Sequence, residues 1–491
     1  MLNPVKGALR MAPVARQTLV YVGAMMLSRA MSFVLVPVYT HRLGTAAYGL
    51  AELLDTVDLV CIVVASSAVA DPFLRHFHDA TTPEAKDRVT STAVLALAGA
   101  GALLAAVGAA VSGPAARWLL GDAGHAALLR ITFGTVVFQG VVEVPLARLR
   151  GTGRPLQYAA WTLARAAIGL ALNVALIAGL GLGIRGLVLS TLIASGVTAT
   201  TLVVLTLRRT GLGFDMAVLR RMVAFGWPLV PGTLALVALQ HGRSWVLARS
   251  FGLDDVGRWA LGFKFGALVT QVVGNPVRSA WSAEMYRVWD ALGGRAAYPK
   301  ALTYLAALYA SAAVALSVAA PEVVRAVAPP SFAPAAAVIP AVAWAFVFRE
   351  VGEFFRGGLV VGGDTRAVAW IEPAVAALDL ALGIVIVPRF GLPGAAALTP
   401  LVFAIYATAL HRAARKVLGV AFESRRLALL LALGVLLSAA SFVVPWTSTT
   451  ARLGARALLA VTFPLLALTL VFREPAERAA VRALRQRLRW W

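Results

Sequence analysis

Long apolar runs recur along the whole chain, and they limit its fold more than any other feature. The first extends from Leu19 to Val38, and at about 1.5 Å of rise per residue a helix of that length crosses a bilayer. Hydrophobic residues fill 60% of the 491 positions, which is more than a soluble domain needs. Membrane barrels are built from short alternating segments, whereas these runs are long. We therefore expect an all-α polytopic membrane protein.

We predict fourteen transmembrane helices, because one span needs about 18 or more apolar residues in a row. Most connections are short and carry Gly, Pro or Arg, and two longer polar loops are expected near 73–88 and 282–300. The predicted helices cover residues 18–40, 49–72, 89–112, 126–148, 157–179, 185–207, 225–248, 257–281, 301–320, 334–357, 367–388, 393–411, 427–446 and 454–472.

Lys and Arg are concentrated in the even-numbered loops and at both chain ends, as at Arg148, Arg150 and Arg154. The odd-numbered loops hold few, among them Arg117 and Arg389. By the positive-inside rule, this bias places both termini in the cytoplasm, in a protein of the inner (cytoplasmic) membrane. The net charge of +22 suits anionic membrane lipids as partners. It does not indicate nucleic acid, because the basic residues form short clusters between apolar runs.

The chain repeats itself at an offset of about 208 residues, which predicts two lobes of six helices each. Because six is an even number, both copies enter the membrane from the same side, and we expect a site between them near mid-depth. The predicted domains are an N-terminal lobe (1–212), a C-terminal lobe (213–420), and two extra helices with a basic cytoplasmic tail (421–491). The landmarks are Leu43–Ala51 over Phe251–Trp259, Trp161 over Trp370, and Gly183–Gly186 over Gly391–Gly394.

Three motifs resemble the polysaccharide transporter branch (O-antigen and exopolysaccharide flippases) of the multidrug/oligosaccharidyl-lipid/polysaccharide exporter superfamily. They are L-G-x-x-x-Y-G-x-A at 43–51, R-G-x-G-R at 150–154, and the glycine turns at 183–186 and 391–394. The resemblance covers nearly the whole chain. It implies two six-helix lobes facing a central cavity. It also implies flipping of undecaprenyl-pyrophosphate-linked oligosaccharides by alternating access, with a polysaccharide polymerase and glycosyltransferases as partners.

Basic side chains inside the predicted helices are candidate ligands for the head group of such a lipid. Arg29 interrupts the first apolar run near its middle, Arg243 lies on the seventh helix, and Lys264 lies on the eighth. Arginine binds phosphate through a planar fork of donors, and lysine acts as a point charge. Gln240 and His241 add polar groups beside Arg243 that suit a sugar. The alternative for Arg243 is that it snorkels to the outer membrane surface.

Three acids, Glu52, Asp55 and Asp58, share one side of the second predicted helix because they are spaced i, i+3, i+6. A helical hairpin turning near Thr45 brings Asp58 to the depth of Arg29. Charge at membrane depth faces a partner or a water-filled cavity. Two interpretations remain open: a structural ion pair with Arg29, or acids that bind H⁺ or Na⁺ and couple transport to an ion gradient.

A second group of charges on the fourth and tenth helices is a candidate gate. Glu143 falls over Glu350 at an offset of 207. Arg349, Glu350, Glu353 and Arg356 are spaced to pair along one helix. They either neutralise one another near the cytoplasmic mouth, or form a gate whose ion pairs break as the lobes rock.

Three further intramembrane charges suggest a latch between the lobes. Adding the repeat offset of 208 to residue 165 gives position 373, which is next to Glu372. Arg165 and Glu372 therefore occupy nearly equivalent places in the two copies and carry opposite charges. Asp379 lies two helical turns further along the same predicted helix. A cross-lobe contact between these charges is a hypothesis that the sequence alone leaves open.

The chain carries no phosphate-binding GxxxxGK[ST] loop, and its six histidines show no metal-ligand spacing. We therefore expect a transporter, not an enzyme, with neither a metal nor an organic cofactor. The alternative within transport is a multidrug/cation antiporter of the same superfamily, whose substrates favour an acidic cavity. A membrane-embedded glycosyltransferase or polymerase is a further alternative. It needs catalytic carboxylates at a membrane face and usually a large outside loop, and no such loop is present.

Overall fold

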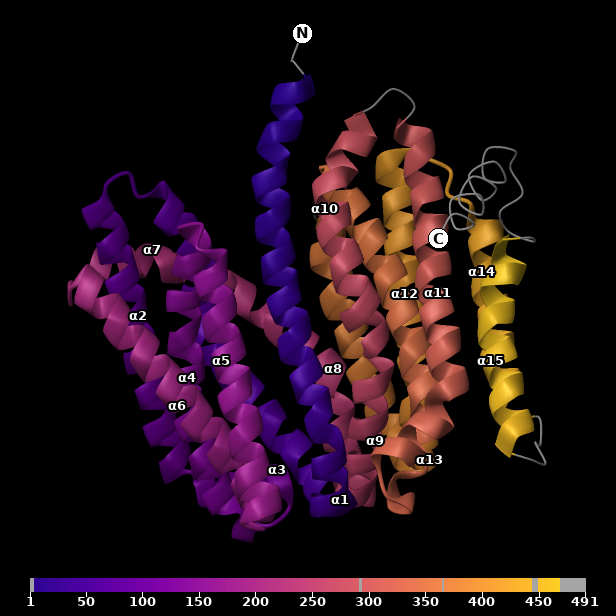
Figure 1. Cartoon of the computed structure of the whole chain (residues 1–491), viewed down its shortest axis with the longest axis horizontal. Coiled ribbons are helices and arrows are strands. Elements are labelled where there is room, and N and C mark those ends of the chain that lie inside the picture. Colours follow the sequence, from indigo (N-terminus) through magenta and orange to yellow (C-terminus); the bar gives the residue numbers. More distant parts are fainter. Residues whose placement is uncertain (1–3, 291–293, 364–365, 444–448, 469–491) are drawn as a thin grey trace. The chain divides into compact units, whose positions relative to one another are not determined.

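The computed structural model describes residues 4–290, 294–363, 366–443 and 449–468. All regular secondary structure within these ranges is helical (Figure 1). Ten helical spans in this part of the chain are long and apolar enough to cross a membrane. These observations confirm the predicted all-α polytopic fold.

The chain divides into two compact units, and each is a bundle of helices (Figure 1). Unit 1 comprises Met1–Ala260 with Val327–Ser331, and unit 2 comprises Leu261–Ala326 with Phe332–Trp491. The elements up to the end of unit 1 are α1 (Pro4–Asp79), α2 (Pro83–Ala110), α3 (Ser112–Leu120), η1 (Ala123–His125), α4 (Ala126–Gly151), α5 (Pro155–Asn173), η2 (Val174–Gly179), α6 (Gly183–Thr210), α7 (Met216–Gly226), η3 (Trp227–Leu229) and α8 (Val230–Phe251).

Helix α9 (Leu253–Gly266) begins in unit 1 and ends in unit 2. The later elements are η4 (Val269–Gly274), α10 (Asn275–Asp290), α11 (Gly294–Val327), η5 (Pro330–Phe332), α12 (Ala335–Val361), α13 (Arg366–Leu418), α14 (Ser424–Val443) and α15 (Thr449–Leu466). Each of the fourteen predicted segments has a helical counterpart among these elements, although the ends predicted at 446 and 472 lie outside the described residues.

Two long helices each correspond to two predicted segments, because a glycine bends each of them. Helix α1 has a non-helical backbone at Gly44 (φ 76°, ψ 178°), and α13 has one at Gly391 (φ 56°, ψ −140°). Residues with a Cβ rarely adopt such positive φ values, whereas glycine adopts them at little cost. The first and second predicted helices are therefore the two arms of α1, and the eleventh and twelfth are the two arms of α13.

The predicted duplication is visible in the backbone conformation. Three pairs of glycines with positive φ are separated by the same 208 residues. Equal spacing of such rare conformations means that the chain turns at the same point in both copies. The pairs are Gly44 (76°) with Gly252 (85°), Gly183 (55°) with Gly391 (56°), and Gly211 (75°) with Gly419 (62°).

The two copies of the first glycine motif contact each other inside unit 1, where α1 crosses α9. A Cβ added to Gly49 would lie 2.1 Å from the carbonyl oxygen of Leu253, and one added to Gly257 would lie 2.0 Å from that of Thr45. Adding 208 to 45 and 49 gives 253 and 257, so the contact is symmetric under exchange of the copies. The motif glycines are thus needed for a backbone crossing on a pseudo-two-fold axis.

Helices α7 and α8 pack on α1, so unit 1 extends beyond the predicted lobe boundary at residue 212. Val63 and Ala68 of α1 form a buried cluster with Val230 and Val237 of α8. Gly226 of α7 also lies against α1, where an added Cβ would be 2.3 Å from the oxygen of Ala68. The lobes at 1–212 and 213–420, which follow the duplication, stay a prediction.

Candidate functional site

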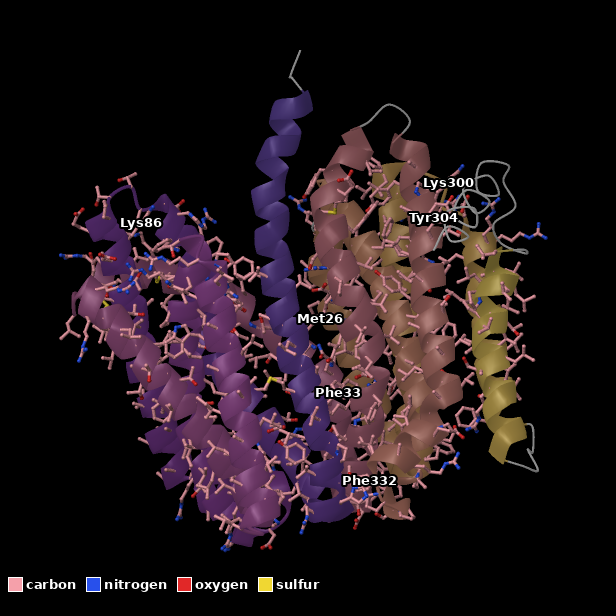
Figure 2. The ribbon with its side chains drawn as sticks, viewed as in Figure 1. Met26, Phe33, Lys86, Lys300, Tyr304 and Phe332 are labelled. Carbon is pink, nitrogen blue, oxygen red and sulfur yellow. The ribbon has the colours of Figure 1, made fainter. Side chains whose placement is uncertain are left out.

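Arg29 is half-buried on the first arm of α1. Figure 2 labels Met26 and Phe33 on the same arm. The predicted ion pair between Arg29 and Asp58 is wrong, because Asp58 Oδ2 instead accepts a 2.7 Å hydrogen bond from Gln139 Nε2 of α4. Equal depth on two helices does not determine which faces meet. The second arm of α1 turns Asp58 towards α4, and within the described residues no carboxylate pairs with Arg29.

Asp58 belongs to a polar network that joins four helices of unit 1. Gln139 Oε1 accepts a 3.1 Å hydrogen bond from Arg165 Nη2 of α5, and Arg165 also donates to Ser195 Oγ of α6 at 3.4 Å. Arg165, the proposed latch residue, is therefore held by neighbours in its own unit. Gln139 and Ser195 were not predicted from the sequence as site residues. The only signal for them was that each is a polar residue within an apolar run.

A small pocket adjoins this network. It is lined by Asp55 and Asp58 together with the hydroxyl-bearing side chains of Thr132, Thr135 and Thr191. Asp58 Oδ1 is buried and has no hydrogen-bond partner within the described residues. Carboxylate and hydroxyl oxygens are ligands that hard cations prefer. Two of the three predicted acids, Asp55 and Asp58, thus line a polar pocket rather than pairing with Arg29.

Two of the remaining predicted residues, one on α1 and one on α8, are in contact. His241 Nδ1 lies 3.1 Å from Glu52 Oε1, so a predicted head-group residue pairs with a predicted coupling acid. Gln240 is half-buried on the same helix. Arg243 is only 2% exposed, so it is buried in protein, which contradicts the snorkelling alternative. Lys264, on α9, belongs to unit 2.

Glu350 of α12 is held in a cage of polar groups in unit 2, with its side chain 1% exposed. Its Oε1 accepts a 2.8 Å hydrogen bond from Thr270 Oγ1, and its Oε2 lies 3.3 Å from Arg278 Nη1. Gly274 completes the cage, because a Cβ there would be 2.8 Å from the carboxylate carbon. The predicted pairing of Glu350 along its own helix is therefore wrong. Arg349 lies instead over the ring of Phe346, at 5.7 Å.

A second network in unit 2 joins α12 to α13. Arg356 is 3.5 Å from Glu353, which confirms the predicted i, i+3 pair, and its Nε is 2.9 Å from Glu372. Tyr406 donates a 3.1 Å hydrogen bond to Glu353. Glu372 thus has a partner in its own unit, as Arg165 has. Among the other predicted residues, Asp379 is buried on α13, and Glu143 is exposed on α4.

Each unit therefore contains a network of carboxylates and arginines within its apolar helices, half-buried in unit 1 and centred on the buried Glu350 in unit 2. Such networks are costly to bury unless every charge has partners. The cross-lobe latch and the gate between Glu143 and Glu350 stay predictions.

The sequence and the fold were compared with those of known proteins. The profile of one family, described as polysaccharide biosynthesis protein, matches residues 79–337. No curated protein matches the chain in sequence. Among solved structures, the lipid II flippase MurJ in an inward closed conformation is similar, with 13% identity and a TM-score of 0.75 over 92% of this chain and 98% of that protein.

Two further structures have related folds. An inward-facing multidrug resistance MATE transporter of the MOP superfamily matches with 14% identity and a TM-score of 0.66, over 79% of this chain and 94% of its own. A MOP superfamily transporter from Pyrococcus furiosus, described as having a binding pocket of reverse polarity, matches with 14% identity and a TM-score of 0.58, over 82% and 95%. At these identities the likeness concerns the fold alone.

The family match covers more than half of the chain, and the three similar structures cover 92%, 79% and 82% of it. The motifs at 43–51 and 150–154 carried the same resemblance in the sequence. The chain belongs to the polysaccharide biosynthesis protein family.

Proposed function

We propose that this protein is a flippase that moves undecaprenyl-pyrophosphate-linked oligosaccharides across the cytoplasmic membrane for cell-surface polysaccharide synthesis. The observation that carries the proposal is the family match to polysaccharide biosynthesis proteins in a chain with an exporter fold. Sugar units are assembled on a lipid before polymerisation, so a membrane protein of this family has a glycolipid to carry. The same fold includes a lipid II flippase, whose substrate is also a glycolipid.

The chemistry of unit 1 supports an anionic substrate. Arg29 is a cation at membrane depth without a carboxylate partner among the described residues. A pyrophosphate group offers the oxygens that such a guanidinium requires. A multidrug antiporter exports organic cations and needs uncompensated carboxylates. Glu52 and Glu350 have His241 and Arg278 as partners. The remaining pocket acids, Asp55 and Asp58, are assigned below to a coupling ion.

Alternating access requires a source of energy, and we assign it to an H⁺ or Na⁺ gradient. The pocket beside Asp55 and Asp58 supports this assignment, because it offers carboxylate and hydroxyl oxygens near a buried oxygen atom without a partner. Both termini are assigned to the cytoplasm by the positive-inside bias. A polysaccharide polymerase and glycosyltransferases of O-antigen or exopolysaccharide synthesis are the expected partners. They would supply the glycolipid and consume it.

Reconstituted protein tests the proposal directly. Proteoliposomes would contain the full chain and a polyprenyl-diphosphate oligosaccharide, and an external lectin would report its movement between leaflets. We expect the wild type to accelerate exchange several-fold over empty liposomes when an ion gradient is applied. Movement of a fluorescent organic cation, without movement of the glycolipid, would establish the antiporter instead.

Arg29 variants test the role of the cation in the same assay. Arg29→Lys keeps the charge but loses the two-pronged geometry, and Arg29→Gln loses both. Since Arg29 has no carboxylate partner, neither change leaves a buried acid unpaired. We expect both variants to insert into the membrane normally. Arg29→Lys should flip the glycolipid more slowly than the wild type, and Arg29→Gln should lower the flipping rate at least about 10-fold relative to the wild type. Normal flipping by Arg29→Gln would remove Arg29 from the substrate path.

A further inference from the structure

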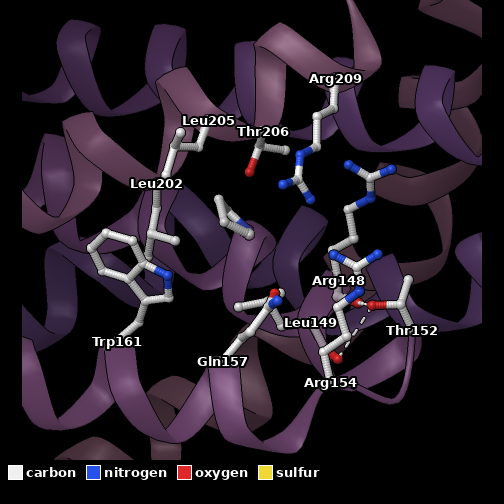
Figure 3. Close-up of a pocket in the computed structure, with 11 residues that line it drawn as sticks. Arg148, Leu149, Thr152, Arg154, Gln157, Trp161, Leu202, Leu205, Thr206 and Arg209 are labelled. Carbon is white, nitrogen blue, oxygen red and sulfur yellow. Dashed lines mark hydrogen bonds between the residues drawn. The ribbon is translucent and has the colours of Figure 1, made fainter.

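A pocket of about 310 Å³ lies in unit 1, where the last turns of α4 and α6 meet the first turn of α5. Figure 3 shows the side chains of Arg148, Arg154 and Arg209 on one side and Trp161 on the other. Small-ligand pockets range from about 300 to 1,000 Å³. The hollow is thus large enough for a ligand such as a diphosphate with part of its carrier.

The positive charge of this pocket is only partly neutralised. Arg148 Nη2 pairs with Asp87 Oδ1 of α2 at 2.5 Å. Arg154 and Arg209 form no ion pair within the described residues, and no carboxylate lines the pocket. The positive charges of Arg154 and Arg209 lie close enough to Arg148 to repel its guanidinium group. Three guanidinium groups against one carboxylate leave two positive charges uncompensated, and an anion in the hollow would relieve their repulsion.

A second hollow in the same unit provides a contrast. It measures about 770 Å³ and is lined by Arg75, Arg88 and Arg221, but also by Asp79 and Asp215. Arg75 lies 3.9 Å from Asp79. In that hollow carboxylates and arginines both line the wall, as on an ordinary protein surface that carries charges of both signs. Of these two hollows in the described part of unit 1, the pocket of Arg148 is the one that combines convergent arginines with a lining free of acids.

Arginines near the ends of membrane helices are common, because they follow the positive-inside rule and offset the helix dipole. Arg208, in the last turn of α6, satisfies both requirements; like Arg154 and Arg209 it is exposed, but it does not line the pocket. Its neighbour Arg209 lines the hollow beside Arg154, which comes from the start of α5. Charge bias alone does not require guanidinium groups from three helices to converge on one space.

The opposite side of the pocket is apolar and aromatic. Trp161, Leu202 and Leu205 form it, and Gln157 and Thr206 contribute polar groups to the lining (Figure 3). A guanidinium binds phosphate oxygens through two parallel hydrogen bonds. An indole ring offers a broad apolar face with one polar edge, which suits a prenyl chain or a sugar ring. The two sides together match a ligand that joins phosphate to an apolar or glycosidic group.

We propose that this pocket binds the diphosphate of a lipid-linked head group before that group enters the transport path. The end of the unit where the pocket lies is the one that the basic-residue bias assigns to the cytoplasm. The identity of the lipid rests on the proposed function, whereas the phosphate site does not. Two lipids carry the required phosphate oxygens, a polyprenyl diphosphate and the anionic phospholipids of the bilayer.

Binding of farnesyl diphosphate to the full-length protein tests the site. The protein would be purified in detergent, stripped of phospholipid and titrated in a calorimeter. The test variant is Arg154→Gln with Arg209→Gln, and the matched control is Arg208→Gln, which removes a neighbouring charge outside the pocket. We expect the double variant to bind at least about 10-fold more weakly, and the control to bind as the wild type does.

A second variant tests the apolar side of the pocket without changing its charge. Trp161→Leu is expected to retain binding of inorganic pyrophosphate and to weaken binding of farnesyl diphosphate several-fold. Thermal unfolding of each variant verifies that it is folded. The site is overturned if the folded wild type binds neither probe, or if the double variant and Arg208→Gln lose affinity equally.

Nanodiscs distinguish the two sources of phosphate. If farnesyl diphosphate still binds in phosphatidylglycerol discs, the site selects the diphosphate carrier. If binding survives only in phosphatidylcholine discs, the phosphate site is confirmed and anionic phospholipid is its occupant. Flipping by the wild type together with unchanged binding by the double variant would overturn the pocket alone. Absence of flipping by the wild type would overturn the proposed function while leaving the phosphate site standing.

Discussion

At the scale of single residues, the charged groups within each unit are arranged as networks rather than as isolated ion pairs. Asp58 and Arg165 are linked through Gln139, which accepts from the arginine and donates to the acid. Glu350 is enclosed by Thr270 and Arg278 in the same way. In each network a neutral amide or hydroxyl group forms a hydrogen bond with a charged group, in addition to any contact with an opposite charge.

Removing the bridging amide should therefore destabilise unit 1. Gln139→Leu leaves Asp58 and Arg165 each without one hydrogen bond, and we expect a loss of about 1–3 kcal/mol in the free energy of unfolding. Thermal unfolding in detergent measures it. Gln240→Leu makes the same chemical change at a half-buried position of α8 without disturbing this network. Equal losses in the two variants would show that the network does not stabilise the unit.

At the scale of elements, glycines determine where the long helices bend and where they cross. Gly44 and Gly391 allow turns inside α1 and α13, and Gly49 and Gly257 allow the backbones of α1 and α9 to touch. The crossing is the same contact seen from either copy of the repeat. Its stability therefore depends on both glycines in the same manner.

Gly49→Ala and Gly257→Ala should each weaken this crossing, because the new Cβ would overlap a carbonyl oxygen of the facing helix. We expect losses of about 1–3 kcal/mol or more, similar in the two variants. Gly23→Ala is the matched control, since an added Cβ on that part of α1 meets nothing within 4 Å. Thermal unfolding and the yield of monodisperse protein would be measured. Unchanged stability in both crossing variants would contradict the pseudo-symmetric contact.

At the scale of the whole molecule, we expect the basic residues to define how the chain is oriented in the membrane. Because the repeat unit contains an even number of predicted helices, both copies keep the same orientation. The uneven distribution of Lys and Arg between alternate loops then selects one of the two possible orientations. The phosphate pocket and the proposed access route for the lipid both depend on this choice.

Topology reporters check the orientation. Fusions after Arg154, Arg209 and Arg473 are expected to report the cytoplasm, and fusions after Arg117 and Arg389 the outside. The third position lies outside the described residues, so its expectation comes from the sequence alone. Alkaline phosphatase and a cytoplasmically fluorescent protein are suitable reporters. Two or more fusions on the opposite side would overturn both the helix count and the orientation.

The sequence by itself determined the helical membrane fold, the duplication and the family. These properties depend on local features: the length of apolar runs, the spacing of glycines, and motifs confined to a few residues. The pair Glu353 and Arg356 was predictable for the same reason, because an i, i+3 spacing on one helix is set by helix geometry.

Only the tertiary structure decided which charges meet. Depth along a helix follows from residue number, but the rotation of the helix about its axis is set by packing against neighbours. Asp58 therefore meets Gln139 and not Arg29, and Glu350 meets Arg278 across a π-helical segment. The phosphate pocket was hidden for the same reason. Its arginines come from three helices, and their convergence exists only once α4, α5 and α6 are packed.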